Sequence, residues 1–288
     1  MTARPLATRV ILVVLDGLRP DAIDAFDLQH CRALMARSAW TDRGTSVAPS
    51  VTAAALTSMF TGVSPDIHGV DDDKFRLPKA PHRLSLITNN LLAAGLPTAV
   101  HVRRVPWLFR ALASRMARYA GAAVVSMKGD TAPEILDAAE PTLARRGNGF
   151  VFVHLPDADR VGHIHGWMSP QYGRAAQTLD QAVGRLVHEY RVLDDPGTLL
   201  IACADHGGGG AVRTHHNSAH PDDRTIPVML AGAGVVPGRL QQSVHWLDLP
   251  ATVLWSLGVA VPLSWQGAPL TAAFSSPKPP VAVAHVAA

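Results

Sequence analysis

The sequence predicts an α/β protein with a doubly wound, mostly parallel sheet and helices on both faces. Short apolar runs, typical of buried strands, alternate along the chain with stretches of helical period. Several runs are continuously apolar, as expected for parallel strands that are covered on both sides. The hydrophobic content of 48% over 288 residues is sufficient for a sizeable core.

The predicted strands are apolar runs that end at turn residues or polar residues. The first, RVILVVL, is followed directly by Asp16 and Gly17. The predicted strands cover residues 9–15, 97–102, 122–127, 149–155, 197–204 and 226–232.

The predicted helices separate these strands, and several carry capping signals. Thr131 is a candidate N-cap with Pro133 in the first turn, and Ser169 and Pro170 open the longest helix. Gly95 suits the C′ position of its helix. The predicted helices cover residues 27–39, 51–62, 82–95, 106–121, 131–147, 169–193 and 245–258.

The domain organisation is predicted to be simple, because the sequence shows no internal repeat and no linker. We expect one catalytic domain over residues 1–274. Within it, residues 71–130 are expected to lie at an edge or to form a small cap. The Pro- and Ala-rich residues 275–288 are expected to form a loose tail.

Composition excludes several classes of partner. The net charge is +3, and Lys and Arg are spread along the chain, so no nucleic acid polymer is expected as a partner. An anionic small molecule fits this charge better. The apolar run 10–15 is too short for a signal peptide or a membrane span, so we expect a cytoplasmic protein without a membrane partner. Two cysteines form no disulfide framework, and nothing indicates the oligomeric state.

Carboxylates and imidazoles follow three of the predicted strands. Asp16-Gly17 follows the first strand, PDADRVGHIHG follows 149–155, and Asp205-His206 with four glycines follows 197–204. In open α/β sheets the carboxyl ends of the strands meet at one edge, where ligands bind. The sequence therefore predicts a site at this edge.

Each of these features also has an ordinary structural explanation. Asp-Gly after a strand is a common turn, Asp159 and His163 could form a solvated helical pair, and His216 could be an exposed loop histidine. The run after His206 is harder to explain, because a turn needs one or two glycines rather than four. Together the features favour a functional site.

The donor types indicate a metal site. Carboxylates and neutral imidazoles are typical zinc ligands and also suit manganese or iron. Two ions about 4 Å apart can hold the attacking and leaving oxygens of an in-line displacement. The chain carries enough such ligands for two divalent ions.

A nucleophile for such a displacement is present before a short Ala-rich helix. Ser50 and Thr52 lie in APSVTAAALTSMFTG, where a hydroxyl at a helix N-terminus meets free N–H groups and the positive end of the dipole. Ser and Thr also cap helices there routinely. A metal-bound alkoxide at this position would be activated for attack on phosphorus or sulfur.

The order of these motifs resembles the alkaline phosphatase superfamily, in particular its type I phosphodiesterase/nucleotide pyrophosphatase branch. The motifs are LDG, SVT with FTGVSPDIHG, DADRVGH, ADHGG, and a histidine loop followed by DDRTIPVMLAG, and the resemblance covers residues 10 to 260. It implies a doubly wound α/β sheet with two zinc ions at the strand ends.

The resemblance also implies roles for individual residues. Thr52 is the implied nucleophile, since it precedes the Thr of the TG motif by nine residues as in the family. His216 is preferred to its neighbours because it lies ten residues before Ile226. The implied ligands of one metal are Asp16, Thr52, Asp205 and His206, and those of the other are Asp159, His163 and His216. Asp157, His165 and His215 are then neighbours of the site.

One position departs from the pattern of the resemblance. Many family members carry an Asn three residues after the nucleophile that binds a phosphate oxygen, and this chain has Ala55 there. Loss of one such donor can cost about 100-fold in rate. Backbone N–H groups or a distant arginine, for example Arg103 or Arg104, are candidates to replace it.

The implied function is a metal-dependent hydrolase of small phosphate esters that forms a phosphothreonine. A phosphodiesterase or nucleotide pyrophosphatase is favoured, because no extra positive charge lies near the nucleophile motif to suit a doubly charged monoester. A phosphomonoesterase, a sulfatase-like enzyme and a non-catalytic metal-binding relative are the alternatives. SVTAAAL lacks the Pro and Arg of the sulfatase signature. The substrate-binding residues are not identified.

Overall fold

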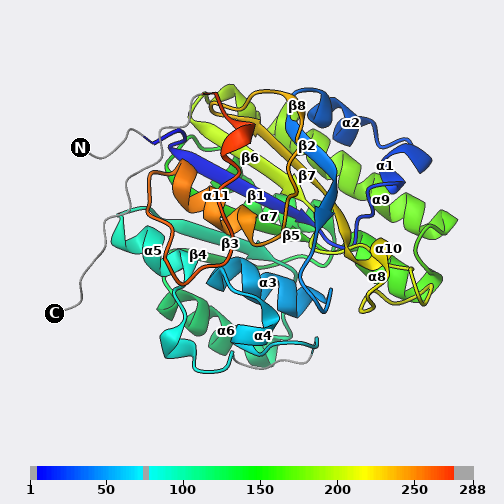
Figure 1. Ribbon diagram of the computed structural model, residues 1–288, viewed down its shortest axis with the longest axis horizontal. Coiled ribbons are helices and arrows are strands. Elements are labelled where there is room, and N and C mark those ends of the chain that lie inside the picture. The colour runs from blue at the N-terminus through cyan, green and yellow to red at the C-terminus, as the bar shows by residue number, and fades with distance from the viewer. Residues whose placement is uncertain (1–4, 74–77, 276–288) are drawn as a thin grey trace.

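The computed structural model describes residues 5–73 and 78–275, and these residues form an eight-stranded sheet (Figure 1). The strands are β1 (Arg9–Leu15), β2 (Ala39–Thr45), β3 (Thr98–Val102), β4 (Val124–Met127), β5 (Gly149–Leu155), β6 (Thr198–Cys203), β7 (Thr225–Gly232) and β8 (Gly238–Arg239). Their order in the sheet is β4-β3-β5-β1-β6-β7-β2-β8.

The centre of the sheet is parallel, which confirms the predicted fold class. β4, β3, β5, β1 and β6 run parallel to one another, and β7 and β2 are each antiparallel to the strand before them in the sheet. All seven residues of β1 are buried, as are those of β5, because helices cover both faces. Val14 of β1 lies beside His154 of β5 and Cys203 of β6, so the carboxyl ends of these strands are level.

The helices form one layer on each face of the sheet. On one face, α3 (Thr52–Thr61), α5 (Ile87–Ala93) and α11 (Asp248–Ser256) contact one another, and in Figure 1 they lie in front of the strands. On the other face, α9 (Pro170–Gly184) packs against α2 (Gln29–Ala36) and α7 (Ala132–Leu143). The remaining α-helices of the described residues are α1 (Ala22–Ala25), α4 (Pro65–His68), α6 (Trp107–Tyr119), α8 (Asp157–His165) and α10 (Pro221–Arg224).

The predicted end of one helix is wrong. The helix predicted over 27–39 ends at Ala36, and Ala39–Thr45 forms β2, a strand that the sequence pattern did not reveal. The longest helix continues from α9 into a π-helical turn over Arg185–Glu189 and ends near the predicted point.

Two predictions about domain organisation are not decided by the structure. β3 and β4 fall within residues 71–130, the stretch considered as an edge or small cap, and they form one edge of the sheet. The predicted tail 275–288 lies outside the described residues except for Ser275.

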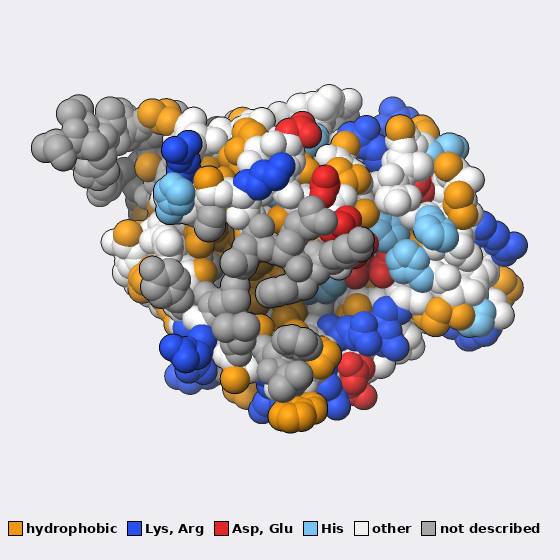
Figure 2. Space-filling model, turned by 90° about the horizontal axis from the view of Figure 1, so that it is seen from below, with side chains coloured by type: hydrophobic (Ala, Val, Ile, Leu, Met, Phe, Trp, Pro, Cys, Tyr) orange, Lys and Arg blue, Asp and Glu red, His pale blue; other side chains and the backbone are white. Residues whose placement is uncertain are grey.

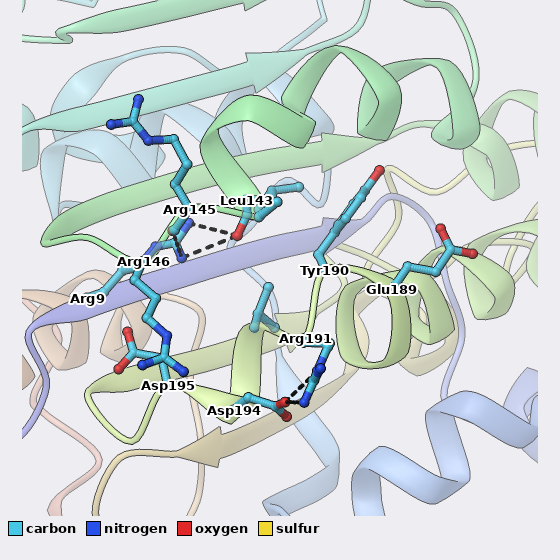
Figure 3. A pocket seen from close by; sticks show the side chains of 11 residues that line it. Arg9, Leu143, Arg145, Arg146, Glu189, Tyr190, Arg191, Asp194 and Asp195 are labelled. Atoms are coloured by element: carbon cyan, nitrogen blue, oxygen red, sulfur yellow. Dashed lines mark hydrogen bonds and ion pairs between the residues drawn. The ribbon is translucent and has the colours of Figure 1, made fainter.

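Arg9, at the amino end of β1, binds the C-terminus of α7. The guanidinium of Arg9, which is only 3% exposed, donates hydrogen bonds to the carbonyl oxygens of Thr142, Leu143 and Arg145 at the C-terminus of α7. A cavity of about 320 Å³ opens beside these groups (Figure 3). Cations at a helix C-terminus are favourable, so the contacts give Arg9 a structural role.

Within the described residues, none of the helices has the length and apolarity that crossing a bilayer would require.

Candidate metal centre

Three carboxylates meet at the carboxyl ends of β1, β5 and β6. Asp16 follows β1 directly, Asp205 comes two residues after β6, and Asp159 lies in the first turn of α8, which follows β5. The backbone N–H of Asp159 donates to the carbonyl oxygen of Asp16 at 3.0 Å. Gly17 makes this approach possible, because a Cβ atom there would lie 2.9 Å from the Cα of Asp159.

Three histidines present Nε2 to these carboxylates. In each ring Nδ1 faces a backbone carbonyl oxygen: Gly207 for His206, Thr214 for His163, and Ser50 for His216. Since a carbonyl oxygen only accepts hydrogen bonds, Nδ1 carries a proton in each ring, and Nε2 is the nitrogen that would bind a metal in exchange for any proton it holds. This arrangement orients metal-binding histidines in other proteins.

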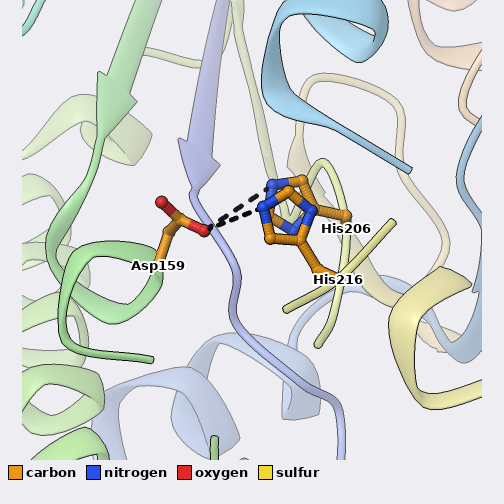
Figure 4. Close-up of side chains that lie close together, drawn as sticks. All are labelled: Asp159, His206 and His216. Atoms are coloured by element: carbon orange, nitrogen blue, oxygen red, sulfur yellow. Dashed lines mark ion pairs between the residues drawn. The ribbon is translucent and has the colours of Figure 1, made fainter. Parts of the chain in front are cut away.

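One group of donor atoms surrounds Asp159. Its Oδ1 lies 3.3 Å from Nε2 of His163 and 3.5 Å from Nε2 of His216, and the two nitrogens are 3.1 Å apart. Figure 4 shows His216 and His206 stacked, with their rings directed at Asp159. The three residues implied for one metal therefore lie together.

A second group surrounds Nε2 of His206. This nitrogen lies 3.3 Å from Oδ1 of Asp16, 3.7 Å from Oδ2 of Asp205 and 3.0 Å from the hydroxyl oxygen of Thr52. These are the four residues implied for the other metal. The two groups adjoin, because Nε2 of His206 is also 4.0 Å from Oδ1 of Asp159.

The free donor atoms fit a cation. Among the described residues, the buried atoms without a hydrogen-bond partner include one oxygen from each of the three carboxylates, namely Asp16 Oδ1, Asp159 Oδ1 and Asp205 Oδ2. Buried carboxylate oxygens are costly unless they are paired or bind a metal. Nitrogen and carboxylate oxygen together suit zinc and other divalent transition metals.

Burial and the charges of neighbouring groups shift the pKa values of side chains in the site. Burial, and then the charges of Asp205 and Asp159, raise the pKa of Asp16 to about 7. Burial alone would raise the pKa of Asp205, but His206 and His154 lower it. Burial and the proximity of His206 lower the pKa of His216 to about 4, so its imidazole is neutral at physiological pH and able to bind a metal.

The four glycines after His206 allow the chain to turn through a crowded space. A Cβ atom on Gly207 would lie 2.0 Å from the carbonyl oxygen of Asp222, and one on Gly208 would lie 2.2 Å from the indole of Trp167. Cβ atoms on Gly209 and Gly210 would meet Trp167 and His220 at 2.6 and 2.5 Å. The glycine run is therefore explained by close packing beneath the ligand loop.

Thr52 is the first residue of α3 rather than its N-cap. The N-cap is Val51, whose side chain offers no hydrogen bond, so the Thr52 hydroxyl is free to face His206. Ser50, the other hydroxyl considered, donates to the carbonyl oxygen of His216 and supports the ligand loop. The geometry thus favours Thr52 over Ser50 as the nucleophile.

His154 is a residue of the site that the sequence analysis missed. It lies in β5 with its Nε2 3.3 Å from Oδ2 of Asp16 and 3.9 Å from Oδ2 of Asp205, and its side chain is buried. The three residues form a group of potential ligand atoms of their own. The only signal in the sequence was a histidine inside the apolar strand GFVFVHL.

The sequence analysis named one acid and two histidines as neighbours of the site, and the structure places them differently. Asp157 accepts a hydrogen bond from the backbone N–H of Ala132 at 2.7 Å and caps the N-terminus of α7. His165 and His215 are exposed, and the ring of His215 lies 6.2 Å from that of His163, so His215 is a neighbour of the site.

The groups considered for phosphate binding lie elsewhere. Ala55 is fully buried, and its carbonyl oxygen accepts a hydrogen bond from the indole of Trp246. Arg103 and Arg104 both form ion pairs with Asp130, at 3.5 and 3.3 Å. The ion-pair partner of both arginines is therefore Asp130, and these contacts do not bring either side chain to Thr52.

The site reaches the surface through His163, whose side chain is 41% exposed. Figure 2 shows a face of the molecule on which histidine side chains gather beside acidic ones, with Lys and Arg side chains next to them.

Comparison with known families gives two matches. The model of the type I phosphodiesterase/nucleotide pyrophosphatase family matches residues 10–124, and that of the metalloenzyme superfamily matches residues 113–261. The two matched ranges include all seven residues predicted as ligands or nucleophile.

Curated relatives are similar to parts of this chain. A phosphopentomutase from Methylobacterium sp. is 31% identical over 183 residues, which are 62% of this chain and 40% of the relative. The chain spans less than half of the length of the curated relatives that it matches first.

Solved structures share the fold. Murine ectonucleotide pyrophosphatase/phosphodiesterase 5, as an inactive variant in complex with AMP, superposes with a TM-score of 0.70 at 11% identity, covering 92% of this chain and 99% of that one. A putative sulfatase from Bacteroides thetaiotaomicron superposes with a TM-score of 0.71 at 12% identity, covering 92% and 74%.

Proposed function

Because the chain belongs to the metalloenzyme superfamily, which includes the alkaline phosphatase-like enzymes, we propose that it is a two-metal hydrolase of small phosphate esters. Phosphodiesters or pyrophosphates are the proposed substrates, in keeping with the type I phosphodiesterase match over residues 10–124. Thr52 is the proposed nucleophile.

The observation that carries the proposal is the position of the Thr52 hydroxyl. It lies 3.0 Å from Nε2 of His206, the nitrogen that also faces the unpartnered oxygens of Asp16 and Asp205, and Thr52 is the first residue of α3. A hydroxyl that only capped its helix would face the backbone of α3 instead.

The proposed ligand sets are those of the sequence analysis. Asp16, Thr52, Asp205 and His206 would hold one ion, and Asp159, His163 and His216 would hold the other, with zinc as the ion that this donor set favours. Two such ions, when bound, supply positive charge at the attacking and leaving oxygens and lower the pKa of an oxygen nucleophile.

The reaction proceeds in two displacements on phosphorus. The Oγ1 atom of Thr52 forms a bond to phosphorus while the bond to the leaving alcohol or phosphate breaks. Water then attacks the phosphothreonine, which restores the hydroxyl and releases the phosphorylated product. The carbonyl contacts of His206, His163 and His216 hold the imidazoles in place, and α3 directs its N-terminal dipole at the transferred group.

The test compares turnover of three esters: bis-p-nitrophenyl phosphate, p-nitrophenyl phosphate and p-nitrophenyl sulfate. We expect the zinc-loaded wild type to favour the diester. Thr52→Ala should lower the rate of ester hydrolysis by a factor of about 1,000 or more. Losses on this order are known for the removal of catalytic hydroxyls.

The matched control is Thr57→Ala, because Thr57 lies in the same helix and its hydroxyl donates to the carbonyl oxygen of Ala53. Intact mass spectrometry of wild type quenched during turnover should detect one covalent phosphoryl adduct that Thr52→Ala lacks. Full turnover by Thr52→Ala would remove Thr52 from its proposed role. A preference for the sulfate ester would replace the phosphodiesterase assignment by a sulfatase.

A further inference from the structure

An acidic residue from another loop contacts the first turn of the nucleophile helix. Oδ1 of Asp73 accepts a hydrogen bond from the backbone N–H of Ala53 at 3.2 Å. Ala53 directly follows Thr52 and is the second residue of α3. Asp73 comes from the loop after α4, twenty positions along the chain from its partner, and its side chain is exposed at the surface.

This contact caps one of the free N–H groups at the N-terminus of α3. Val51 provides no capping side chain, so the first N–H groups of α3 are open to an external acceptor. A helix N-terminus favours anions, and beside a nucleophile the anion to be bound is the phosphoryl group of the substrate. In this chain a fixed carboxylate already lies against one of those N–H groups.

The negative charge of Asp73 repels phosphate esters to different extents. A diester carries one negative charge on its phosphoryl group, whereas a monoester carries close to two at neutral pH. Like charges a few ångströms apart repel each other, so a carboxylate at this position opposes each additional negative charge on the substrate. Ala55, fully buried on the same helix, supplies no compensating donor.

We propose that Asp73 is a specificity-determining residue that selects singly charged phosphodiesters over doubly charged phosphomonoesters. This inference rests on the proposed function and names the chemical basis of its substrate preference. Asp73 acts on the charge of the phosphoryl group at Thr52 and holds no metal.

The direct test is Asp73→Asn, which removes the charge and keeps a carbonyl oxygen for the N–H of Ala53. The ratio of kcat/KM for p-nitrophenyl phosphate to kcat/KM for bis-p-nitrophenyl phosphate should rise about tenfold or more, since one repulsive unit charge is lost. The matched control is Asp66→Asn, which removes an exposed carboxylate from neighbouring α4 and should leave the ratio unchanged.

Binding of inorganic phosphate to the zinc-loaded protein, measured by isothermal titration calorimetry, gives a second readout without turnover. Asp73→Asn should bind phosphate about tenfold more tightly than wild type, for the same electrostatic reason. An unchanged ester ratio together with unchanged phosphate affinity would overturn the role of Asp73. If wild type hydrolyses neither ester, the proposed function fails, and the phosphate affinities of the two proteins still decide the inference.

Discussion

At the scale of single residues, most side chains of the candidate centre have one polar atom fixed by a hydrogen bond and a second polar atom that faces the centre. Asp205 accepts backbone hydrogen bonds from Gly17 and His206 through Oδ1 and leaves Oδ2 without a partner. The imidazoles of His163, His206 and His216 are held through Nδ1. Ligands held in this way need little reorganisation when a metal binds.

His154 lies next to Asp16, with its Nε2 3.3 Å from Oδ2, although within the described residues this nitrogen has no hydrogen-bond partner. We predict that His154→Ala weakens zinc binding by about 10- to 100-fold, as expected for loss of a group that orients a ligand. Competition with a chromogenic chelator measures the affinity.

The control for His154→Ala is His165→Ala, which removes an exposed histidine at the end of α8. Its zinc affinity should equal that of wild type. Equal affinity in His154→Ala as well would show that His154 does not support the centre.

His101 gives a prediction that is independent of metal. It is 2% exposed in β3, and neither ring nitrogen has a hydrogen-bond partner within the described part of the chain. Burial lowers its pKa from 6.5 to about 4. Since the unfolded chain takes up the proton first, His101 costs stability as pH falls from 6.5 towards 4.

The free energy of unfolding should therefore decrease by about 3 kcal/mol less in His101→Leu than in wild type between pH 6.5 and pH 4. The figure follows from 1.36 kcal/mol per pKa unit. Urea unfolding of wild type and variant at a series of pH values measures this difference. Parallel curves for the two proteins would refute it.

The residues proposed as ligands could be named from the sequence because each follows a recognisable strand or belongs to a motif. Asp16 and Asp205 follow apolar runs, and Asp159 and His163 share one helical face. His154 and Asp73 were not predictable on these grounds. One lies inside a strand whose other residues form the core, and the other reaches α3 only through the folded path of a loop.

At the scale of elements, the glycine loop and Trp167 act as one unit. The indole of Trp167 lies against Gly208 and Gly209 and donates a hydrogen bond to the carbonyl oxygen of Gly17 at 3.0 Å. Asp223 fixes the far end of the loop, accepting from the backbone N–H of Gly210 at 2.8 Å. The loop after β6 is therefore tied to the turn after β1, which sets Asp16 and His206 relative to each other.

We predict that Gly207→Ala disrupts this loop. Its Cβ would lie 2.0 Å from the backbone oxygen of Asp222, which cannot move cheaply. The expected loss is about 2–4 kcal/mol in the free energy of unfolding, as for strained or overpacked sites, together with weaker zinc binding.

Gly147→Ala is the matched control, since a Cβ atom there meets nothing within 4 Å. Thermal unfolding and chelator competition compare the two variants. If both behave like wild type, the packing explanation of the glycine run is wrong.

Elements with a strong apolar pattern were predicted from the sequence, whereas weakly patterned ones were not. β1, β5 and β6 are continuously buried and were recognised. β2 was missed because AWTDRGT carries two charges and is only partly buried, which conceals a strand near the sheet edge. Tertiary pairing with β7 stabilises it rather than local preference.

At the scale of the whole molecule, the centre depends on distant parts of the chain. β1 lies between β5 and β6, so residues that follow strands more than 130 positions apart in sequence share one edge. The carboxylates of Asp16, Asp159 and Asp205 are brought together by this topology at an electrostatic cost, which bound cations would remove.

Metal binding should therefore stabilise the whole fold. Zinc at about 100 times its Kd should raise the free energy of unfolding by about 2.7 kcal/mol per site, and chelation should reverse the gain. Thermal unfolding with zinc and with chelator measures it, and Asp159→Asn should show a smaller gain than wild type. An equal melting temperature with and without zinc would argue against a specific site.

The most direct test of the account is a crystal structure of the zinc-loaded protein with anomalous data at the zinc edge. We expect two anomalous peaks. One should be bound by Asp16, Thr52, Asp205 and His206, and the other by Asp159, His163 and His216. Peaks at other residues, or none at these two positions, would contradict the assignment of a two-metal centre around the Thr52 hydroxyl.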